Sequence, residues 1–180
     1  YPENDKVHFL YLGRIMKEKG MDELFYAAKE LQRKEVPFVL DLVGFFEDEY
    51  KEKIDKLVDA KIAVFHGFQE DPRPYYAMAD CVVLPSYHEG MSNVLLEAAA
   101  TGRPVITSNI PGCKEAVDDG KSGLLCEAED WNDLYRKMSK IAQMSRIERE
   151  AMGVCGRDKM AQEFDKDKVV KKTIQGIERV

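Results

Sequence analysis

Two glutamates stand eight positions apart in the segment SYHEGMSNVLLEAAATGRPVITS, residues 86–108. The second, Glu97, interrupts an apolar run that predicts a helix beginning at Asn93. Ser92 is a candidate N-cap, and the free amides of Asn93 and Val94, with the helix dipole, would attract an anion. Glu97 lies one turn further along the same face, and its side chain would lean back toward the helix start. The pattern favours a ligand that carries hydroxyl groups, such as a ribose diol, beside a phosphate.

The first glutamate, Glu89, precedes Gly90 and Met91 and lies upstream of the same helix terminus. Its carboxylate could accept hydrogen bonds from hydroxyl groups at the far end of such a ligand. Both glutamates also have plainer interpretations. Glu89 would then be an acid on a surface loop, and Glu97 a partly buried acid paired with a base such as Arg103. The glycine next to Glu89 favours the ligand-binding interpretation, because glycine lets the backbone approach a ligand closely.

A cation-rich segment, GRIMKEKG at residues 13–20, follows the first expected strand. Its end glycines, of which Gly13 is the first, again allow close approach of a ligand. Arg14 offers a planar fork for a phosphate group, and Lys19 offers a point charge. The alternative is a solvated basic loop without a ligand.

Glycines also follow the second and third expected strands, at Gly44 and Gly67. His66 could contact a ligand or be a polar residue at the end of a strand, and Phe68 follows it closely. Turn chemistry is the alternative for each of these positions. Taken together, the glycines indicate that several strand ends are trimmed so that a ligand can approach.

The elements that must position these loops alternate regularly along the chain. Short apolar runs predict strands at 7–12, 38–43, 62–65, 81–84, 104–107 and 123–126. Helices are expected at 21–34, 48–58, 74–79, 93–100 and 130–144, with Asp130 as an N-cap of the last and a charged helical tail from about 145. Apolar strands that alternate with helices indicate an α/β fold with a doubly wound parallel sheet, Rossmann-like. Such folds bind ligands outside the carboxyl ends of the strands, at a switch point in strand order.

Composition limits the possible partners. The 180 residues fit one domain, 1–180, and the net charge of −6 with a pI of about 5.2 argues against nucleic acid. No apolar run approaches the ~20 residues of a membrane span. The four cysteines form no CxxC pair, which argues against a metal site and favours reduced thiols in a cytoplasmic location. Because the chain starts at Tyr1, directly before a strand, we expect it to be a fragment of a longer protein.

At this point the motifs match a known family. Glu89 and Glu97 resemble the E-x7-E motif of retaining glycosyltransferases with the GT-B fold (glycosyl transferases group 1). The segment 13–20 is similar to that family's G-R-x(4)-K-G segment, and DGKSGLL at 119–125 resembles its D-G-x-x-G turn. The likeness covers about residues 7 to 145, in the family's order, and corresponds to the C-terminal donor-binding domain.

The resemblance implies a role for each candidate residue. Arg14 and Lys19 would hold the diphosphate of a nucleotide-sugar donor, Glu89 would bind the sugar hydroxyls, and these three would form the catalytic set. Glu97 would bind the ribose. The remaining substrate-binding positions, with the base near the first three of them, would be His66, Gly67, Phe68, Gly13, Gly44, Gly90, Met91, Ser92, Asn93 and Val94.

The resemblance also implies what accompanies this domain. The donor would be a UDP- or GDP-sugar, with no cofactor and no metal, because Arg14 and Lys19 would neutralise the diphosphate. The acceptor, a sugar or a lipid-linked sugar, would bind to an N-terminal domain that is absent from this chain. The full enzyme would build a surface polysaccharide or glycoconjugate, in the cytoplasm or at the inner face of the membrane.

Two other functions stay open. A sugar-nucleotide epimerase would use the same crevice, although the loop with Arg14 and Lys19 argues against it. A non-catalytic nucleotide-binding module would keep the ligand contacts without turnover. A dinucleotide-dependent dehydrogenase is disfavoured, because no GxGxxG segment follows the first strand.

Overall fold

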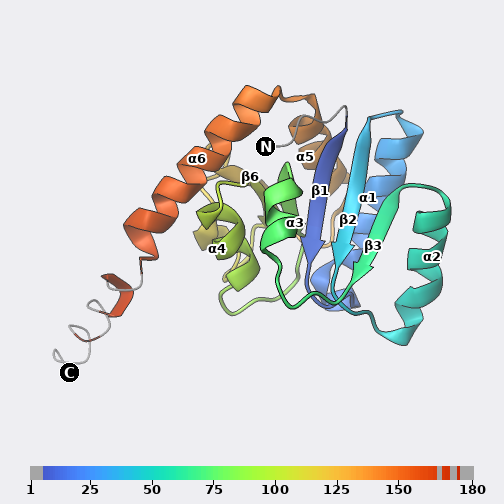
Figure 1. Ribbon diagram of the computed structural model, residues 1–180, viewed down its shortest axis with the longest axis horizontal. Coiled ribbons are helices and arrows are strands. Elements are labelled where there is room, and N and C mark those ends of the chain that lie inside the picture. The colour runs from blue at the N-terminus through green and yellow to red at the C-terminus, as the bar shows by residue number, and fades with distance from the viewer. Residues whose placement is uncertain (1–5, 166–167, 171–173, 175–180) are drawn as a thin grey trace.

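The computed structural model describes residues 6–165, 168–170 and 174. Its centre is a six-stranded sheet in the order β3-β2-β1-β4-β5-β6, in which all the paired strands are parallel (Figure 1). The strands are β1 (Val7–Leu12), β2 (Phe38–Val43), β3 (Ala63–Gly67), β4 (Cys81–Leu84), β5 (Val105–Ser108) and β6 (Gly123–Cys126). The expected doubly wound α/β fold is therefore confirmed, and its switch point lies between β1 and β4.

Helices cover both faces of the sheet. They are α1 (Met21–Arg33), α2 (Lys51–Asp59), α3 (Arg73–Met78), α4 (Asn93–Ala100), α5 (Trp131–Gln143) and α6 (Arg146–Glu163). The chain crosses the sheet in opposite directions after β1 and after β4, so right-handed connections place α1 and α4 on opposite faces. There α1 packs against α5, and α4 packs against α6. Short 3₁₀ turns are formed by Lys17–Lys19, Asp48–Tyr50 and Lys114–Ala116.

Most of the sequence-based elements are confirmed to within two residues. The helix expected at 48–58 begins instead as a 3₁₀ turn and becomes α-helical at Lys51. Strand β3 continues through His66 and Gly67, which were expected to follow it. Asp130 caps α5 as predicted, since its side chain accepts hydrogen bonds from the amides of Asn132 and Asp133.

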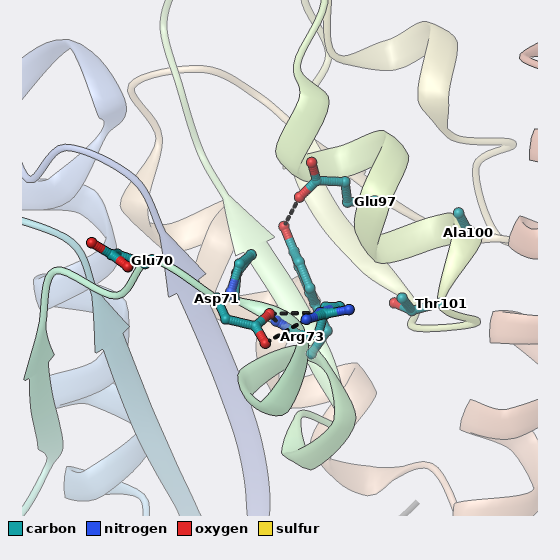
Figure 2. A pocket seen from close by; sticks show the side chains of 8 residues that line it. Glu70, Asp71, Arg73, Glu97, Ala100 and Thr101 are labelled. Carbon is teal, nitrogen blue, oxygen red and sulfur yellow. Dashed lines mark hydrogen bonds and ion pairs between the residues drawn. The ribbon is translucent and has the colours of Figure 1, made fainter. Parts of the chain in front are cut away.

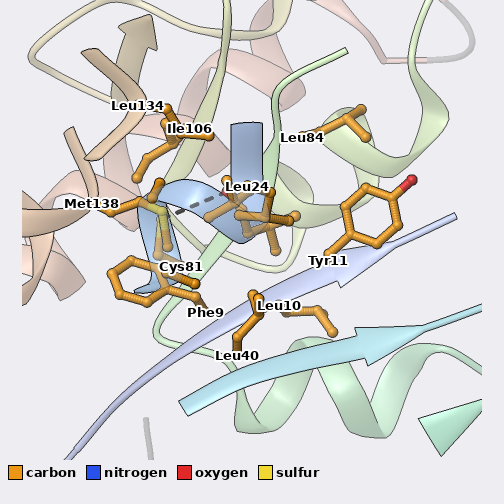
Figure 3. Packing of buried hydrophobic residues seen from close by; sticks show 14 of the residues in the cluster. Phe9, Leu10, Tyr11, Leu24, Leu40, Cys81, Leu84, Ile106, Leu134 and Met138 are labelled. Carbon is orange, nitrogen blue, oxygen red and sulfur yellow. Dashed lines mark hydrogen bonds between the residues drawn. The ribbon is translucent and has the colours of Figure 1, made fainter. Parts of the chain in front are cut away.

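The core lies between the sheet and the helices on its two faces. Strand β1 is central, and its residues Phe9, Leu10 and Tyr11 are at most 1% exposed (Figure 3). This central position explains why β1 is mostly apolar rather than strictly alternating, with His8 as its one strongly polar residue. All four cysteines are free, and three of them are buried. Burial raises the pKa of Cys113 to about 11 and that of Cys126 to about 12, so both are neutral thiols near pH 7.

The expected helical tail is confirmed through Glu163 and packs within this domain. Met152 and Met160 of α6 are buried, and α6 packs against α4, where Gly156 lies beside Ala99. Positions beyond Glu163 are described only in part. Among the described residues, no helix combines the length and apolar character needed to cross a membrane.

Candidate functional site

The carboxyl ends of β1 and β4 open onto a cavity of about 320 Å³ at the switch point. The loops that follow these two strands supply most of its lining. Eight of the residues singled out from the sequence line it, namely Gly13, Arg14, Lys19, Glu89, Met91, Ser92, Asn93 and Val94. Ligand-binding loops follow the strands of a doubly wound sheet. Here two such loops, about 70 residues apart in sequence, lie side by side at the cavity.

Backbone contacts hold the two loops against each other. The carbonyl oxygen of Glu18 accepts hydrogen bonds from the amide of Tyr87, at 2.8 Å, and from the hydroxyl of Ser86, at 3.2 Å. Gly20 has φ of 68°, and a Cβ there would lie 2.0 Å from the carbonyl oxygen of Pro85. Gly20 is therefore required by close packing of backbone on backbone, and the walls of the cavity are fixed relative to each other.

An ion pair joins the two loops across the cavity. Lys19 Nζ donates to Glu89 Oε1 at 2.6 Å, and the two side chains are only 22% and 13% exposed. Arg14 is exposed, and within the described part of the chain its guanidinium has no ion-pair partner. The cavity therefore contains one cation paired with a carboxylate and one cation open to a ligand.

The loop after β5 supports the segment that carries Glu89. The amide of Gly112 donates to Glu115 Oε2 at 2.8 Å, and its carbonyl oxygen accepts from the amide of Ser92 at 3.1 Å. Gly112 has φ of 85°, and a Cβ there would lie 2.2 Å from the carbonyl oxygen of Gly90. Glu115 thus positions a loop.

The N-terminus of α4 faces the same cavity, but the expected cap is wrong in one respect. Ser92 occupies the N-cap position, yet its side chain makes no capping hydrogen bond. Its carbonyl oxygen instead accepts from the amides of Leu95 and Leu96. This leaves the amides of Asn93 and Val94, in the first turn, for an anion in the cavity.

Glu97 lies one turn along α4 and borders a second cavity, of about 470 Å³ (Figure 2). It is exposed, and its Oε2 accepts a hydrogen bond of 3.0 Å from the hydroxyl of Tyr76 on α3. The alternative pairing with Arg103 is not formed, because that guanidinium donates to the carbonyl oxygen of Ala77. Tyr76, only 2% exposed, therefore fixes one carboxylate oxygen of Glu97.

The glycines at the ends of β1, β2 and β3 pack on one another. The amide of Gly44 donates to the carbonyl oxygen of Gly67 at 2.8 Å, and a Cβ on Gly44 would lie 1.9 Å from the carbonyl oxygen of Gly13. Gly44 is thus explained by strand packing, and it does not line the cavity between β1 and β4. Phe68 follows this stack and is 66% exposed, so its ring is accessible to a ligand.

His66 belongs to a partly buried polar cluster that crosses three strands. Its Nε2 lies 2.8 Å from Asp41 Oδ1, and His8 Nδ1 lies 2.8 Å from Asp41 Oδ2. The hydrogen bond with Asp41 raises the pKa of His8, against the opposing effect of burial. The ring of His66 also meets Tyr75 edge-on at 5.0 Å. These contacts account for His66 as a polar residue within a strand end, while its predicted contact with a base stays a prediction.

A family model described as glycosyl transferases group 1 matches residues 6–144. The chain belongs to this family. A capsular polysaccharide biosynthesis glycosyltransferase, CapM of Staphylococcus aureus, is 31% identical over 166 residues, which cover 89% of this chain and 43% of CapM. A glycogen synthase of Mycobacterium tuberculosis H37Rv is 30% identical over 181 residues, which cover 97% of this chain and 43% of the synthase. The chain thus spans less than half the length of these two relatives.

Solved structures show the same architecture. Sucrose-phosphate synthase from Thermosynechococcus elongatus superposes with a TM-score of 0.82 at 27% identity, over 97% of this chain and 45% of that one. HepE of Anabaena, in complex with UDP, superposes with a TM-score of 0.81 at 19% identity, over 98% of this chain and 50% of that one. The sheet of this glycosyltransferase domain is therefore that of a GT-B domain.

The geometry of this glycosyltransferase domain includes residues that sequence reasoning missed. Tyr76 was assigned only to a short helix, and Asp41 only to a strand. A polar residue inside the apolar strand at 38–43 was a usable signal for Asp41, because a buried carboxylate needs partners. Nothing in the sequence distinguished Tyr76 from its neighbour Tyr75.

Proposed function

We propose that this chain is the donor-binding domain of a retaining glycosyltransferase, which moves a sugar from a nucleotide-diphosphate sugar to an acceptor. The observation that carries the proposal is the cavity between β1 and β4. It brings two cations, a helix N-terminus and the carboxylate of Glu89 to one place, next to the cavity of Glu97. The cations and the helix N-terminus suit a diphosphate, and the carboxylates of Glu89 and Glu97 suit hydroxyl groups.

The cations act where charge develops during transfer. The acceptor hydroxyl passes its proton to the leaving diphosphate, and its oxygen bonds to the anomeric carbon of the sugar. The bond from that carbon to the diphosphate breaks, and the nucleoside diphosphate leaves with the electron pair. Arg14, Lys19 and the amides of Asn93 and Val94 line the cavity in which this charge would collect. The proposal assigns no cofactor and no metal to this step.

The carboxylates of Glu97 and Glu89 are proposed to bind different hydroxyl groups of the donor. Glu97 lies one helical turn from Asn93, so a ribose held by Glu97 adjoins a phosphate at the start of α4. Glu89 lines the same cavity as the start of α4 and is proposed to accept hydrogen bonds from the sugar. The base would lie near His66, Gly67 and Phe68. HepE was solved with UDP and with UDP-glucose, and TarM with UDP, which supports a UDP-sugar as the first donor to test, with a GDP-sugar second.

The rest of the reaction is proposed to need the part of the enzyme outside this chain. CapM acts in capsular polysaccharide biosynthesis, and LpsE of Rhizobium meliloti, 28% identical over 170 residues, in lipopolysaccharide core biosynthesis. Both exceed twice the length that this chain matches, since it covers 43% and 47% of them. We therefore propose a sugar or lipid-linked sugar as the acceptor, bound by a further domain. This chain alone should bind the donor without transferring its sugar.

The proposal is tested by the thermal stability of the chain with UDP, GDP, ADP and their sugar forms. A ligand at ~100 times its Kd raises the free energy of unfolding by roughly 2.7 kcal/mol, which shifts the midpoint visibly. Arg14→Ala should abolish the shift. Lys17→Ala is the matched control, because Lys17 is an exposed cation of the same loop that does not line the cavity. An equal loss in both variants, or no shift with any nucleotide at millimolar concentration, would contradict the proposal.

A further inference from the structure

The ion pair between Lys19 and Glu89 joins two groups that the proposed function assigns to different parts of one ligand. Lys19 is assigned to the diphosphate and Glu89 to the sugar, yet Lys19 Nζ lies 2.6 Å from Glu89 Oε1. Both side chains are largely withdrawn from solvent, at 22% and 13% exposure. At such depth a pair is screened less than one on the surface, and it must be broken before Lys19 can bind a phosphate.

Breaking the ion pair has a different result for a nucleoside diphosphate and for a nucleotide sugar. A nucleoside diphosphate takes Lys19 and leaves the Glu89 carboxylate without its donor, beside further negative charge. A partly buried carboxylate that loses its partner is costly. A nucleotide sugar also takes Lys19, but the sugar hydroxyls give Glu89 new hydrogen bonds. Only the intact donor therefore replaces both halves of the pair.

We propose that Glu89 competes with the diphosphate for Lys19, so that the site discriminates against the spent nucleoside diphosphate relative to the intact nucleotide sugar. The inference rests on the proposed function. Arg14 lines the same cavity without an ion-pair partner among the described residues, so it offers first contact to either ligand. After transfer, Glu89 loses its sugar contacts and takes back Lys19, which promotes release of the product.

The test compares dissociation constants for UDP and UDP-glucose, with GDP and GDP-mannose in parallel. Glu89→Gln keeps the shape of the side chain and removes its charge. For the pair of ligands that binds, this variant should bind the nucleoside diphosphate roughly three- to tenfold more tightly than the wild type, as expected for loss of one partly exposed charged partner. Its affinity for the nucleotide sugar should rise less or fall, so the preference for the sugar form narrows.

Two further variants identify the cause. In a Lys19→Ala background, Glu89→Gln should bring no gain, because the gain comes from releasing Lys19. Glu18→Gln makes the same change of net charge on the same loop at an exposed residue that does not line the cavity, so it should not tighten binding.

Each outcome has a definite meaning. A gain in Glu89→Gln that disappears without Lys19 supports the inference. A gain that persists without Lys19, an equal gain in Glu18→Gln, or no gain at all overturns the inference and leaves the proposed function standing. If neither the wild type nor any variant binds UDP, GDP or their sugar forms, the proposed function fails as well.

Discussion

Replacing Tyr76 by Phe tests how Glu97 is held in place for a ribose. Tyr76 is 2% exposed, and its hydroxyl lies 3.0 Å from Glu97 Oε2 and 3.4 Å from the carbonyl oxygen of Val94. The change removes one oxygen atom from a buried ring and leaves the ring itself in place. Glu97 keeps its charge and its position on α4, but its carboxylate becomes free to rotate.

The size of the effect follows from the exposure of the two partners. A hydrogen bond to a charged group contributes about 1.5–3 kcal/mol. Glu97 is exposed, so water can replace the lost donor, and we expect about 1 kcal/mol, or roughly fivefold in affinity. Because Glu97 binds only the ribose hydroxyls in this scheme, the loss should be confined to ligands that carry them.

The assay compares dissociation constants for UDP and 2′,3′-dideoxy-UDP, or for the GDP pair if that base is preferred. The wild type should prefer the ribose form, and Tyr76→Phe should narrow that preference roughly fivefold, the loss estimated for the hydrogen bond. Tyr75→Phe is the control, because the Tyr75 ring packs on His66 rather than on Glu97. If Tyr76→Phe weakens both nucleotides equally, Tyr76 has only a structural role. If it changes neither, the hydrogen bond with Glu97 does not position the ribose acceptor.

Three further predictions concern the frame around the site. Gly20→Ala should destabilise the domain more than the control Gly120→Ala. Both glycines have φ near +70°, but only at Gly20 would a Cβ lie 2.0 Å from a backbone atom. The midpoints of urea unfolding compare the two variants, and the control should cost about 1–2 kcal/mol. The hydrogen bond with Asp41 raises the pKa of His8 above its ordinary 6.5. The protonated His8 therefore stabilises the folded state below pH 6.5, and this contribution is lost as pH rises through the pKa of His8 in the folded protein. His8→Gln should accordingly flatten the fall of the unfolding free energy between about pH 6 and 8. Ser145→Ala removes the capping box of α6 and should cost about 1 kcal/mol, measured in the same way, whereas an unchanged midpoint would show that this helix end contributes nothing.

The sheet was predictable because its inner strands are buried on both faces and therefore read as mostly apolar runs. The boundary error in β3 shows where this signal fails. His66 is polar and was taken to end the strand, but Asp41 of the neighbouring strand gives it a hydrogen-bond partner inside the sheet. A partner on another strand, 25 positions away, cannot be read from a local pattern.

The site was predictable at the level of loops and not at the level of contacts. Parallel strands end at one edge of the sheet, so the loops with Arg14 and Glu89 had to be near each other once the strands were assigned. That Lys19 reaches Glu89 depends on the backbone contacts of Glu18 and Gly20 with the loop after β4. These contacts exist only in the folded chain. The predicted side-chain cap of α4 by Ser92 was wrong, because the backbone contacts around Ser92 likewise exist only in the folded chain.

The two carboxylates of the proposed site, Glu97 and Glu89, each accept a hydrogen bond from a neighbouring side chain, but the consequences differ. Tyr76 occupies one oxygen of Glu97 and leaves the other open, so this contact can persist when a ribose binds. In the proposed function Lys19 also binds the diphosphate, so its contact with Glu89 would have to be exchanged. We therefore expect the proposed ribose end of the site to be preformed and the proposed diphosphate end to exchange its contacts on binding. Because Tyr76 and Glu89 share no partner in the described structure and border different cavities, changes at the two ends should add in binding free energy to within about 0.5 kcal/mol.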